Sequence, residues 1–267
     1  MPPRRRLDAE LVRRGLARSR EQAVALIADG RVTVSGRAAS KPATGVAPAE
    51  PIVVSAGDMS PYVSRGAHKL AGALDVFEPA GLAVVGRRCL DAGASTGGFT
   101  EVLLRRGAAQ VVAVDVGYGQ LAWALRTDPR VVVMDRTNVR ELSPDVVGDP
   151  VELVVADLSF ISLRLVLESL FSCTASDGDL VLMVKPQFEV GRELVGSGGV
   201  VRDPALRAGA VGSVAAAAGD LGLGVAGVTA SPLPGPSGNV EYFLWLREGA
   251  PPLDPVAVER AVQEGPA

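Results

Sequence analysis

The chain has 267 residues and a net charge of −3, and 48% of its residues are hydrophobic, which is enough for one large domain or for a small and a medium one. It contains one histidine, His68, and two cysteines, Cys89 and Cys173, whose spacing matches no metal site, so we expect reduced cysteines and no bound metal. No apolar run approaches the ~18 residues of a membrane span and no secretory signal precedes the first predicted helix, so we expect a cytoplasmic protein that does not associate with membranes.

The basic residues are concentrated at the start of the chain. Residues 1–41 carry ten Lys and Arg against four Asp and Glu, a net charge of +6, whereas the remaining residues carry 17 against 26, a net charge of −9. The basic run has the periodicity of helices and is not of low complexity. It therefore predicts a folded nucleic-acid-binding module on an acidic body.

This module, residues 1–57, is predicted to contain two helices followed by short strands. A first helix over 7–17 has its leucines on one face, and its arginines lie off that face. Ser19 is a favourable N-cap for a second helix over 20–29, and Gly30 is a favourable C-cap.

The sequence of the module also resembles a known family. The pattern Leu-x-x-Arg-Gly-Leu-Ala-x-Ser-Arg-x-x-Ala-x-x-Leu-Ile-x-x-Gly-x-Val-x-Val-x-Gly, which ends at Gly36, resembles the S-four-like (alpha-L) RNA-binding domain. The resemblance implies binding of structured RNA through its shape and backbone. Together with the charge pattern it nominates a set of RNA contacts: Arg4, Arg5, Arg6, Arg14, Arg18, Ser19, Arg20, Arg31, Lys41, Arg65 and His68.

Strands and helices alternate after a short predicted linker, residues 58–63. The alternation over 64–249 predicts an α/β fold, a doubly wound Rossmann-like sheet of seven strands. It includes a helix predicted over 120–126 and a glycine-rich loop over 191–202 that we expect to be mobile. A tight turn rich in Pro and Gly precedes the last strand, which we therefore expect to run antiparallel. The tail, 250–267, is predicted to hold a short helix.

A glycine-rich stretch, Asp91 to Thr100, links a strand predicted over 82–90 to a helix predicted over 100–106. Gly97 and Gly98 are expected to let a ligand approach the backbone. It is neither Gly-x-Gly-x-x-Gly nor a phosphate-binding P-loop, and the acid at its start suits a cationic ligand such as the amino acid end of S-adenosylmethionine (SAM). The alternative, a turn whose glycines only pack the helix on the strand, stays open. The residues nominated for SAM are Asp91, Gly93, Ala94, Ser95, Thr96, Gly97, Gly98 and Phe99.

Further cofactor candidates follow the next strands. Asp115 ends the second strand, near the ~20-residue spacing at which an acid binds ribose hydroxyls, so it predicts a nucleoside, although a nicotinamide cofactor fits this acid too. Arg136, Thr137 and Asn138 follow the third strand and are candidates for the adenine pocket. Asp157 follows the fourth strand at the same edge of the sheet.

Four charged residues are predicted to converge at that edge. Asp157 and Lys185 end consecutive parallel strands, Glu241 begins the antiparallel strand, and Lys69 comes from the helix before the first strand. The chain has 24 arginines and only three lysines, Lys41 being the third. Because a lysine can lose its proton and an arginine does not, the lysines are candidates for catalysis.

The series Lys69, Asp157, Lys185, Glu241 resembles the catalytic tetrad of FtsJ/RrmJ-type ribose 2′-O-methyltransferases. Val-Ser-Arg-Gly-Ala-His-Lys, Ala-Asp-Leu-Ser-Phe-Ile-Ser, Val-Lys-Pro-Gln-Phe-Glu and Gly-Asn-Val-Glu-Tyr-Phe-Leu extend the resemblance to the TlyA family, whose members are also labelled hemolysins. The resemblance implies SAM-dependent methylation of cytidine 2′-OH in 16S and 23S rRNA, and with it sensitivity to capreomycin and viomycin.

The implied mechanism turns the target nucleotide out of its helix, and Lys185 polarises or deprotonates the 2′-OH for in-line attack on the methyl group. Three alternatives remain, of which a SAM-binding RNA chaperone without catalysis is disfavoured by the intact tetrad. A base methyltransferase would need a cysteine nucleophile or an Asn/Asp-Pro-Pro-Tyr-type motif after the fourth strand, where this chain has Asp157-Leu-Ser-Phe. A membrane-lytic hemolysin would need an export signal or an exposed amphipathic segment, and the sequence offers neither.

Overall fold

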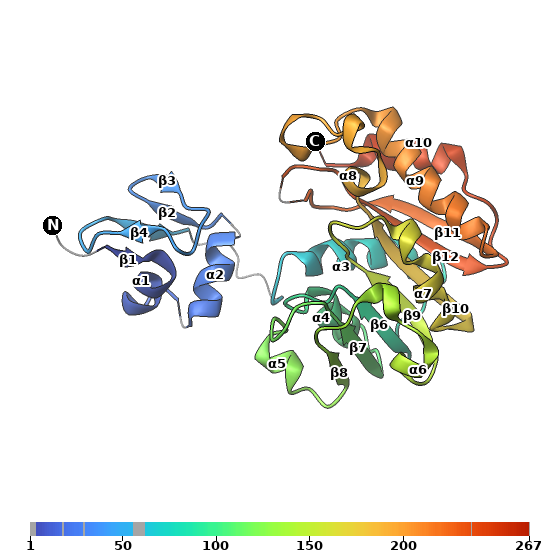
Figure 1. Cartoon of the computed structure of the whole chain (residues 1–267), viewed down its shortest axis with the longest axis horizontal. Helices are drawn as coiled ribbons and strands as arrows, with labels where there is room; N and C mark the ends of the chain where they lie inside the picture. The colour runs from blue at the N-terminus through green and yellow to red at the C-terminus, as the bar shows by residue number, and fades with distance from the viewer. Residues whose placement is uncertain (1–3, 18, 29, 56–61, 236, 267) are drawn as a thin grey trace. The chain divides into compact units, whose positions relative to one another are not determined.

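The computed structural model describes residues 4–17, 19–28, 30–55, 62–235 and 237–266, and the chain divides into two compact units, Met1–Arg65 and Gly66–Ala267 (Figure 1). The predicted RNA contact Arg18 and residues 58–61 of the predicted linker lie outside the described residues.

Unit 1 packs two helices against two small antiparallel sheets, one with the strand order β3-β2-β5 and one formed by β1 and β4. Its core consists of small and branched apolar side chains: Leu7, Leu11, Ala17, Ala23, Leu26, Ile27, Val32, Ala39 and Val46. The elements are β1 (Arg5–Arg6), α1 (Leu7–Arg13), α2 (Arg20–Ala28), β2 (Val32–Val34), β3 (Arg37–Ala38), β4 (Gly45–Val46) and β5 (Ile52–Val54).

Glycines end both helices of unit 1 in the same way. Gly15 has φ 69, and Leu16 donates to the carbonyl of Leu11, so the first helix ends at Arg13 rather than at the predicted residue 17. Gly30 ends α2 with φ 67, as predicted from its type. At the start of α2, Ser19 accepts the amide of Gln22 at 3.1 Å and is the predicted cap.

Unit 2 is built on a seven-stranded sheet with the order β11-β12-β10-β9-β6-β7-β8, in which only β12 is antiparallel to its neighbours. This confirms the predicted Rossmann-like sheet with an antiparallel last strand. In chain order the elements are α3 (Gly66–Phe77), β6 (Arg88–Ala92), α4 (Gly98–Arg105), β7 (Gln110–Val114), α5 (Trp123–Arg126), β8 (Val131–Met134), η1 (Val139–Glu141), α6 (Pro144–Val147), β9 (Val151–Ala156), η2 (Leu163–Leu165), α7 (Leu167–Ser172), β10 (Thr174–Val184), α8 (Pro186–Glu189), η3 (Arg192–Leu194), η4 (Ser197–Gly199), α9 (Pro204–Gly219), β11 (Leu223–Ala230), β12 (Tyr242–Glu248) and α10 (Pro255–Glu264).

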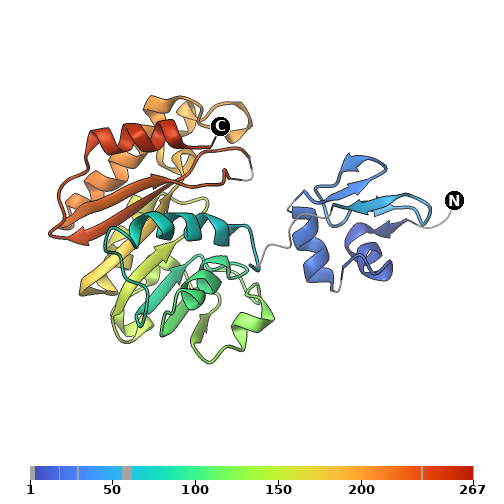
Figure 2. The same ribbon diagram turned by 180° about the vertical axis from the view of Figure 1, so that it is seen from behind.

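Helices cover both faces of this sheet, as Figures 1 and 2 show from opposite sides. The alternation along β12 sorts its side chains between the two faces. Phe243 and Trp245 contact Phe99 of α4 and Phe77 of α3, whereas Tyr242, Leu244 and Leu246 belong to the core that includes α7, α9 and α10.

Two predicted boundaries were wrong. The first strand of unit 2 was expected over 82–90, but Gly86 turns the chain with φ 75 and β6 begins only at Arg88. Asp91 therefore lies inside the strand and not in the loop after it. The helix expected over 120–126 is reduced to α5, four residues long.

The sheet brings the predicted site residues to one edge. Gly93 and Asp115 follow β6 and β7, Asp157 and Lys185 follow β9 and β10, and Glu241 directly precedes the antiparallel β12. Gly93 has φ 86, and a Cβ added to it would lie 2.6 Å from the backbone oxygen of Asp157. The first loop is therefore packed against the end of β9, which only glycine allows.

Candidate active site

Two buried ion pairs form the centre of the site. Lys69 Nζ lies 2.5 Å from Glu241 Oε2, and Lys185 Nζ lies 2.6 Å from Asp157 Oδ1. The lysine side chains are only 8% and 10% exposed. All four residues of the predicted tetrad are thus brought together as two lysine–carboxylate pairs from segments far apart in the sequence.

Glu241 is the most deeply buried member of the four, at 1% exposure. Burial raises the pKa of Glu241, and the positive charges of Lys69 and Lys185 oppose that rise. Its second carboxylate oxygen, Oε1, lies against Gly235, where a Cβ would approach it to 2.6 Å. The turn between β11 and β12 therefore closes directly over this carboxylate.

Lys185 has a second partner that the sequence did not suggest. Its Nζ donates to Ser159 Oγ at 2.9 Å, in addition to pairing with Asp157. The contact with Asp157 is an ion pair and the contact with Ser159 is a hydrogen bond, so an ammonium group with three N–H donors keeps donor capacity for a substrate. Ser159 lies in a loop, and only the three-dimensional structure shows its approach to Lys185.

The loop that carries Ser159 is held by a second buried acid. Glu189, 7% exposed, accepts from Ser162 Oγ at 2.5 Å and from the amide of Leu163 at 2.7 Å. Glu189 ends α8, which begins directly after Lys185. The segment after β10 is therefore joined to the segment after β9 at two points, by Lys185 to Ser159 and by Glu189 to Ser162. Neither Glu189 nor Ser159 was predicted.

The glycine-rich stretch contains a fully buried acid. Asp91 accepts from Thr100 Oγ1 at 2.6 Å, and burial raises the pKa of Asp91 to about 7. Its other oxygen, Oδ1, has no hydrogen-bond partner in the described part of the chain. Gly97, expected to admit a ligand, instead faces Leu121 and Leu125, where a Cβ would clash at 2.8 and 2.3 Å.

Asp115 organises two loops at the carboxyl ends of the strands. Its Oδ2 accepts the amide of Ser95 at 2.8 Å and its Oδ1 accepts the amide of Gly117 at 2.7 Å. The side chain is half-buried, and each of its oxygens accepts one backbone amide. This position suits the predicted contact to ribose hydroxyls.

The three candidates after β8 have different surroundings. Arg136, at φ 56, lies over the ring of Tyr118 at 4.4 Å from its centroid. Thr137 donates its amide to the carbonyl of Asp115 at 2.9 Å. Asn138 caps the short helix η1 by accepting from Arg140, so its amide group already has a local role.

Two aromatic rings pack against each other in the segments that follow β9 and β10. Phe160, next to Ser159, is 92% exposed at φ 65, and its ring lies 5.4 Å from that of Phe188. They line a cleft of about 590 Å³ together with Gln187 and Arg192. The glycine-rich loop 191–202, expected to be mobile, forms one wall of this cleft, and Asn239 holds its end by accepting from Val201 and donating to Gly199.

Most of the predicted RNA contacts of unit 1 are exposed arginines. Arg4 pairs with Glu50, while Arg6 and Arg20 both pair with the buried Asp8. Arg31 donates to the carbonyl of Ser55. Arg5, Lys41 and Arg65 are exposed, His68 is half-buried in the first turn of α3, and Ser19 caps α2.

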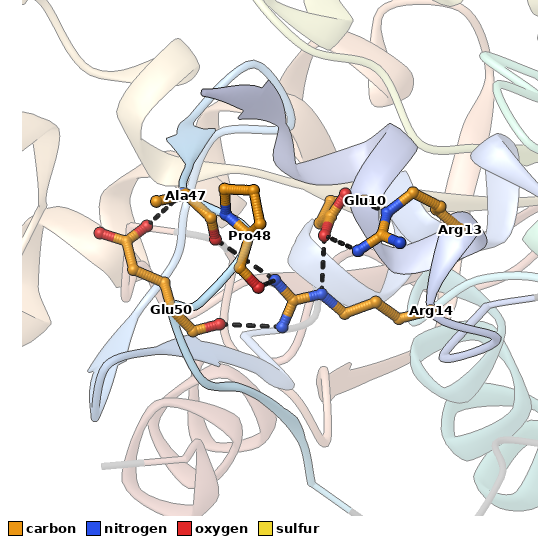
Figure 3. A network of polar contacts seen from close by, with 6 residues as sticks. All are labelled: Glu10, Arg13, Arg14, Ala47, Pro48 and Glu50. Atoms are coloured by element: carbon orange, nitrogen blue, oxygen red, sulfur yellow. Dashed lines mark hydrogen bonds and ion pairs between the residues drawn. The ribbon is translucent and has the colours of Figure 1, made fainter. Parts of the chain in front are cut away.

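Arg14 is the exception among these residues. Its guanidinium donates to Glu10 and to the carbonyls of Ala47, Pro48 and Glu50, and the side chain is only 20% exposed (Figure 3). The contacts fasten the chain between β4 and β5 to α1, so this arginine has a role inside the module.

Two further observations concern membrane spans and metal sites. No helix within the described ranges has the length and apolar character needed to cross a bilayer. Among the same residues, no three His, Cys, Asp or Glu side chains gather as a metal site would require, and both cysteines are buried free thiols.

Comparison with known proteins gives two family matches. Residues 62–248 match the FtsJ-like methyltransferase family and residues 5–52 match the S4 domain. The chain is 61% identical to the 16S/23S rRNA (cytidine-2′-O)-methyltransferase TlyA of Mycobacterium tuberculosis, with 100% of both chains covered. It is 36% identical to hemolysin A of Brachyspira hyodysenteriae, over 89% of this chain and 98% of that protein.

A solved structure shares the whole fold. The structure of a putative hemolysin from Streptococcus thermophilus has a TM-score of 0.76 and 38% identity, and the match covers 99% of this chain and 96% of that one.

Proposed function

This chain belongs to the TlyA family of FtsJ-like methyltransferases, and we propose that it transfers a methyl group from SAM to the ribose 2′-OH of cytidines in 16S and 23S rRNA. The proposal assigns RNA binding to residues 1–57 and methyl transfer to residues 64–249. It places the enzyme in the cytoplasm, where ribosomal subunits are assembled.

One observation supports the chemistry above all others, namely the pairing of two buried lysines with two carboxylates at the carboxyl edge of the sheet. Methylation of a ribose hydroxyl needs a group that can take up or polarise its proton, and a lysine can serve where an arginine cannot. The chain has 24 arginines, yet the cation of each of these two ion pairs is a lysine.

The residues at the same edge fit SAM, which when bound supplies an electrophilic methyl group. Asp115 is half-buried between the loops after β6 and β7, where it can accept from ribose hydroxyls. The carboxyl group of Asp91 has an oxygen without a partner among the described residues, and Gly93 gives the loop its tight turn. The proposed cofactor set also keeps Ala94, Thr96, Gly98, Phe99 and Arg136.

Within the proposed mechanism each member of the tetrad has a separate task. Lys185 directs its remaining N–H, or after losing a proton its lone pair, at the 2′-OH of the target ribose. Asp157 and Ser159 orient Lys185, and Glu241 holds Lys69 close by. Fixing the hydroxyl near the methyl group supplies much of the acceleration, since positioning alone removes a large part of such a barrier.

The exposed ring of Phe160 suits a base that has been turned out of an RNA helix. It adjoins Ser159, so a base stacked on the ring places its ribose near Lys185. A stacking platform is tolerant of base identity, so the ring supports base flipping without selecting cytosine.

The decisive experiment maps 2′-O-methyl groups in rRNA from cells with and without the gene. We expect methylated cytidines in 16S and 23S rRNA that are lost on deletion and restored by the wild-type gene but not by Lys185→Arg. Unchanged methylation in the deletion strain would overturn the proposal.

The hemolysin names of several relatives favour testing membrane lysis as a second function. Leakage of dye from liposomes, measured beside methyl transfer with the same protein preparation, separates the two. We expect methyl transfer without leakage.

A further inference from the structure

Unit 1 buries two carboxylates in the most basic part of the chain. Asp8 is 2% exposed and Glu10 is 1% exposed, both on α1. Each of these acids cancels positive charge that would attract RNA, and burying a carboxylate costs free energy unless it is well paired. Their presence in an RNA-binding unit therefore calls for a physical reason.

For Glu10 the reason is structural. It accepts from Arg13 and Arg14, and the rest of the Arg14 guanidinium is used by backbone carbonyls between β4 and β5 (Figure 3). Glu10 thus helps to hold the module together.

Asp8 pairs with arginines that remain at the surface. Arg6 donates through Nε to Oδ1 at 3.1 Å and through Nη2 to Oδ2 at 3.0 Å, and Arg20 donates through Nη2 to the same Oδ2 at 2.8 Å. The Arg6 and Arg20 side chains are 54% and 61% exposed. Most N–H groups of the two guanidiniums take no part in these bonds, because each carries five donors.

The Asp8 carboxylate stays ionised while it holds them. The hydrogen bonds from Arg6 keep the pKa of Asp8 well below its usual range, with Arg20 and the amide of Ala9 adding to the effect. The two Nη2 atoms share one oxygen, so they lie within about 6 Å of each other. Two donors at this separation can bind different oxygens of one phosphate group.

We propose that Arg6 and Arg20 form a single binding site for a phosphate of the RNA backbone, and that Asp8 is the positioning residue that orders both arginines before RNA arrives. An arginine on its own loses much rotamer freedom when it binds, and ordering it in advance removes that cost. This inference rests on the proposed function, because RNA is the ligand.

The proposal makes a prediction whose sign is opposite to that of simple electrostatics. Asp8→Asn removes a negative charge and keeps an oxygen that can accept from Ala9. Coulomb attraction alone would then tighten RNA binding, whereas loss of the ordered pair weakens it. With full-length protein and the ribosomal subunit that the wild type methylates, we expect the Kd to rise about fivefold to tenfold.

The salt dependence gives a second readout. A plot of log K against log salt concentration should lose slope in Asp8→Asn, by up to about 0.7–0.9 for one phosphate contact. Glu50→Gln is the charge-matched control, because Glu50 is 28% exposed, forms an ion pair with Arg4 through Oε1 and accepts the amide of Ala47 through Oε2, a bond that the Gln side chain can keep. This variant should bind within about twofold of wild type or more tightly.

A double-mutant cycle separates positioning from damage to the fold. In the background of Arg6→Ala with Arg20→Ala, Asp8→Asn should weaken binding no further. A loss that persists there, or unchanged or tighter binding by Asp8→Asn alone, overturns the proposal.

If circular dichroism shows that Asp8→Asn unfolds unit 1, the arginine variants test the proposal in its place. A single site predicts that Arg6→Ala and Arg20→Ala each lose nearly as much affinity as the two together, and additive losses would refute it. If the proposed function itself is wrong, the wild-type protein will neither bind nor methylate the subunit. Such a result differs from a failure of this inference alone, in which the wild type still binds and methylates.

Discussion

The two units pair the same kinds of charge with opposite burial. In unit 1 the acid is buried and its arginines are exposed, as with Asp8 and its partners Arg6 and Arg20. At the carboxyl edge of unit 2 the lysine is buried with its acid, as with Lys69 and Glu241. An exposed guanidinium can meet a hydrated phosphate, whereas a buried amine feels stronger electrostatic forces and can exchange a proton. The difference teaches that burial, and not the presence of an ion pair, distinguishes the proposed RNA-binding surface from the proposed reaction centre.

The largest effect is expected when a lysine of the proposed reaction centre is replaced by arginine. Lys185→Arg keeps the positive charge but cannot act as a base, since guanidinium does not deprotonate in proteins. We expect methyl transfer to fall at least a hundredfold, with SAM and rRNA affinity within a few-fold of wild type, measured by single-turnover kinetics and calorimetry. Retention of more than about a tenth of the rate, ~1.4 kcal/mol of barrier, would make Lys185 an electrostatic anchor.

Asp91 sharpens the comparison because, within the described part of the chain, it is a buried acid whose side-chain hydrogen bond comes from the neutral hydroxyl of Thr100. Burial raises the pKa of Asp91 to about 7, above the ~3.9 of an unfolded chain, so the folded state binds a proton that the unfolded state releases between about pH 4 and 7. Wild-type stability should therefore fall as pH rises through this window. Asp91→Asn removes this dependence.

The relevant measurement is urea unfolding of both proteins without SAM at pH 5 and pH 8. Between pH 5 and pH 8 the free energy of unfolding of the wild type should fall by on the order of 2 kcal/mol more than that of Asp91→Asn. Parallel pH profiles would show that Asp91 stays ionised in the folded protein.

Ser159→Ala tests whether the reaction centre needs more than its ion pairs. Loss of the 2.9 Å hydrogen bond should let Lys185 rotate away from the substrate, so we expect kcat to fall about tenfold with KM nearly unchanged. Ser159→Thr keeps a hydroxyl and should recover part of the rate. Equal losses in the Ala and Thr variants would show that Ser159 acts only through packing.

The smallest effect is expected for Arg14, which is mostly buried, unlike Arg6 and Arg20. Arg14→Ala removes the hydrogen bonds to the chain between β4 and β5, so backbone amides over 45–54 should exchange roughly threefold to fivefold faster, with unit 2 unaffected. Arg14→Lys should not restore protection, because one ammonium cannot reach all three carbonyls. Exchange that is unchanged in Arg14→Ala would show that the loop holds itself.

The features that the sequence predicted correctly depend on local chemistry. Ser19 and Gly30 mark the ends of α2 because a hydroxyl cap and a left-handed glycine act within one turn. The sheet and its antiparallel last strand follow from the alternation of elements and the turn before Tyr242. The convergence of Asp157, Lys185 and Glu241 follows in turn from the strand order, because they lie at the same edge of the neighbouring strands β9, β10 and β12.

The features that it missed depend on contacts between distant segments. Ser159 and Glu189 hold the loops after β9 and β10 together, and no local pattern marks them. In unit 1, charge alone could not distinguish Arg14, which is used inside the module, from Arg20, which remains at the surface. Gly86 was not recognised as a turn, so the strand before Asp91 was predicted too early.

The scarcity of lysine has a practical consequence for chemical labelling. Of the three lysine side chains, Lys41 is exposed in unit 1, whereas Lys69 and Lys185 are buried. Reagents that acylate or cross-link amines should therefore modify Lys41 quickly and the other two slowly. Lysine-directed mass spectrometry on the ribosome would map the surroundings of unit 1, and the slow modification of Lys185 would report how often its buried amine becomes accessible to the reagent.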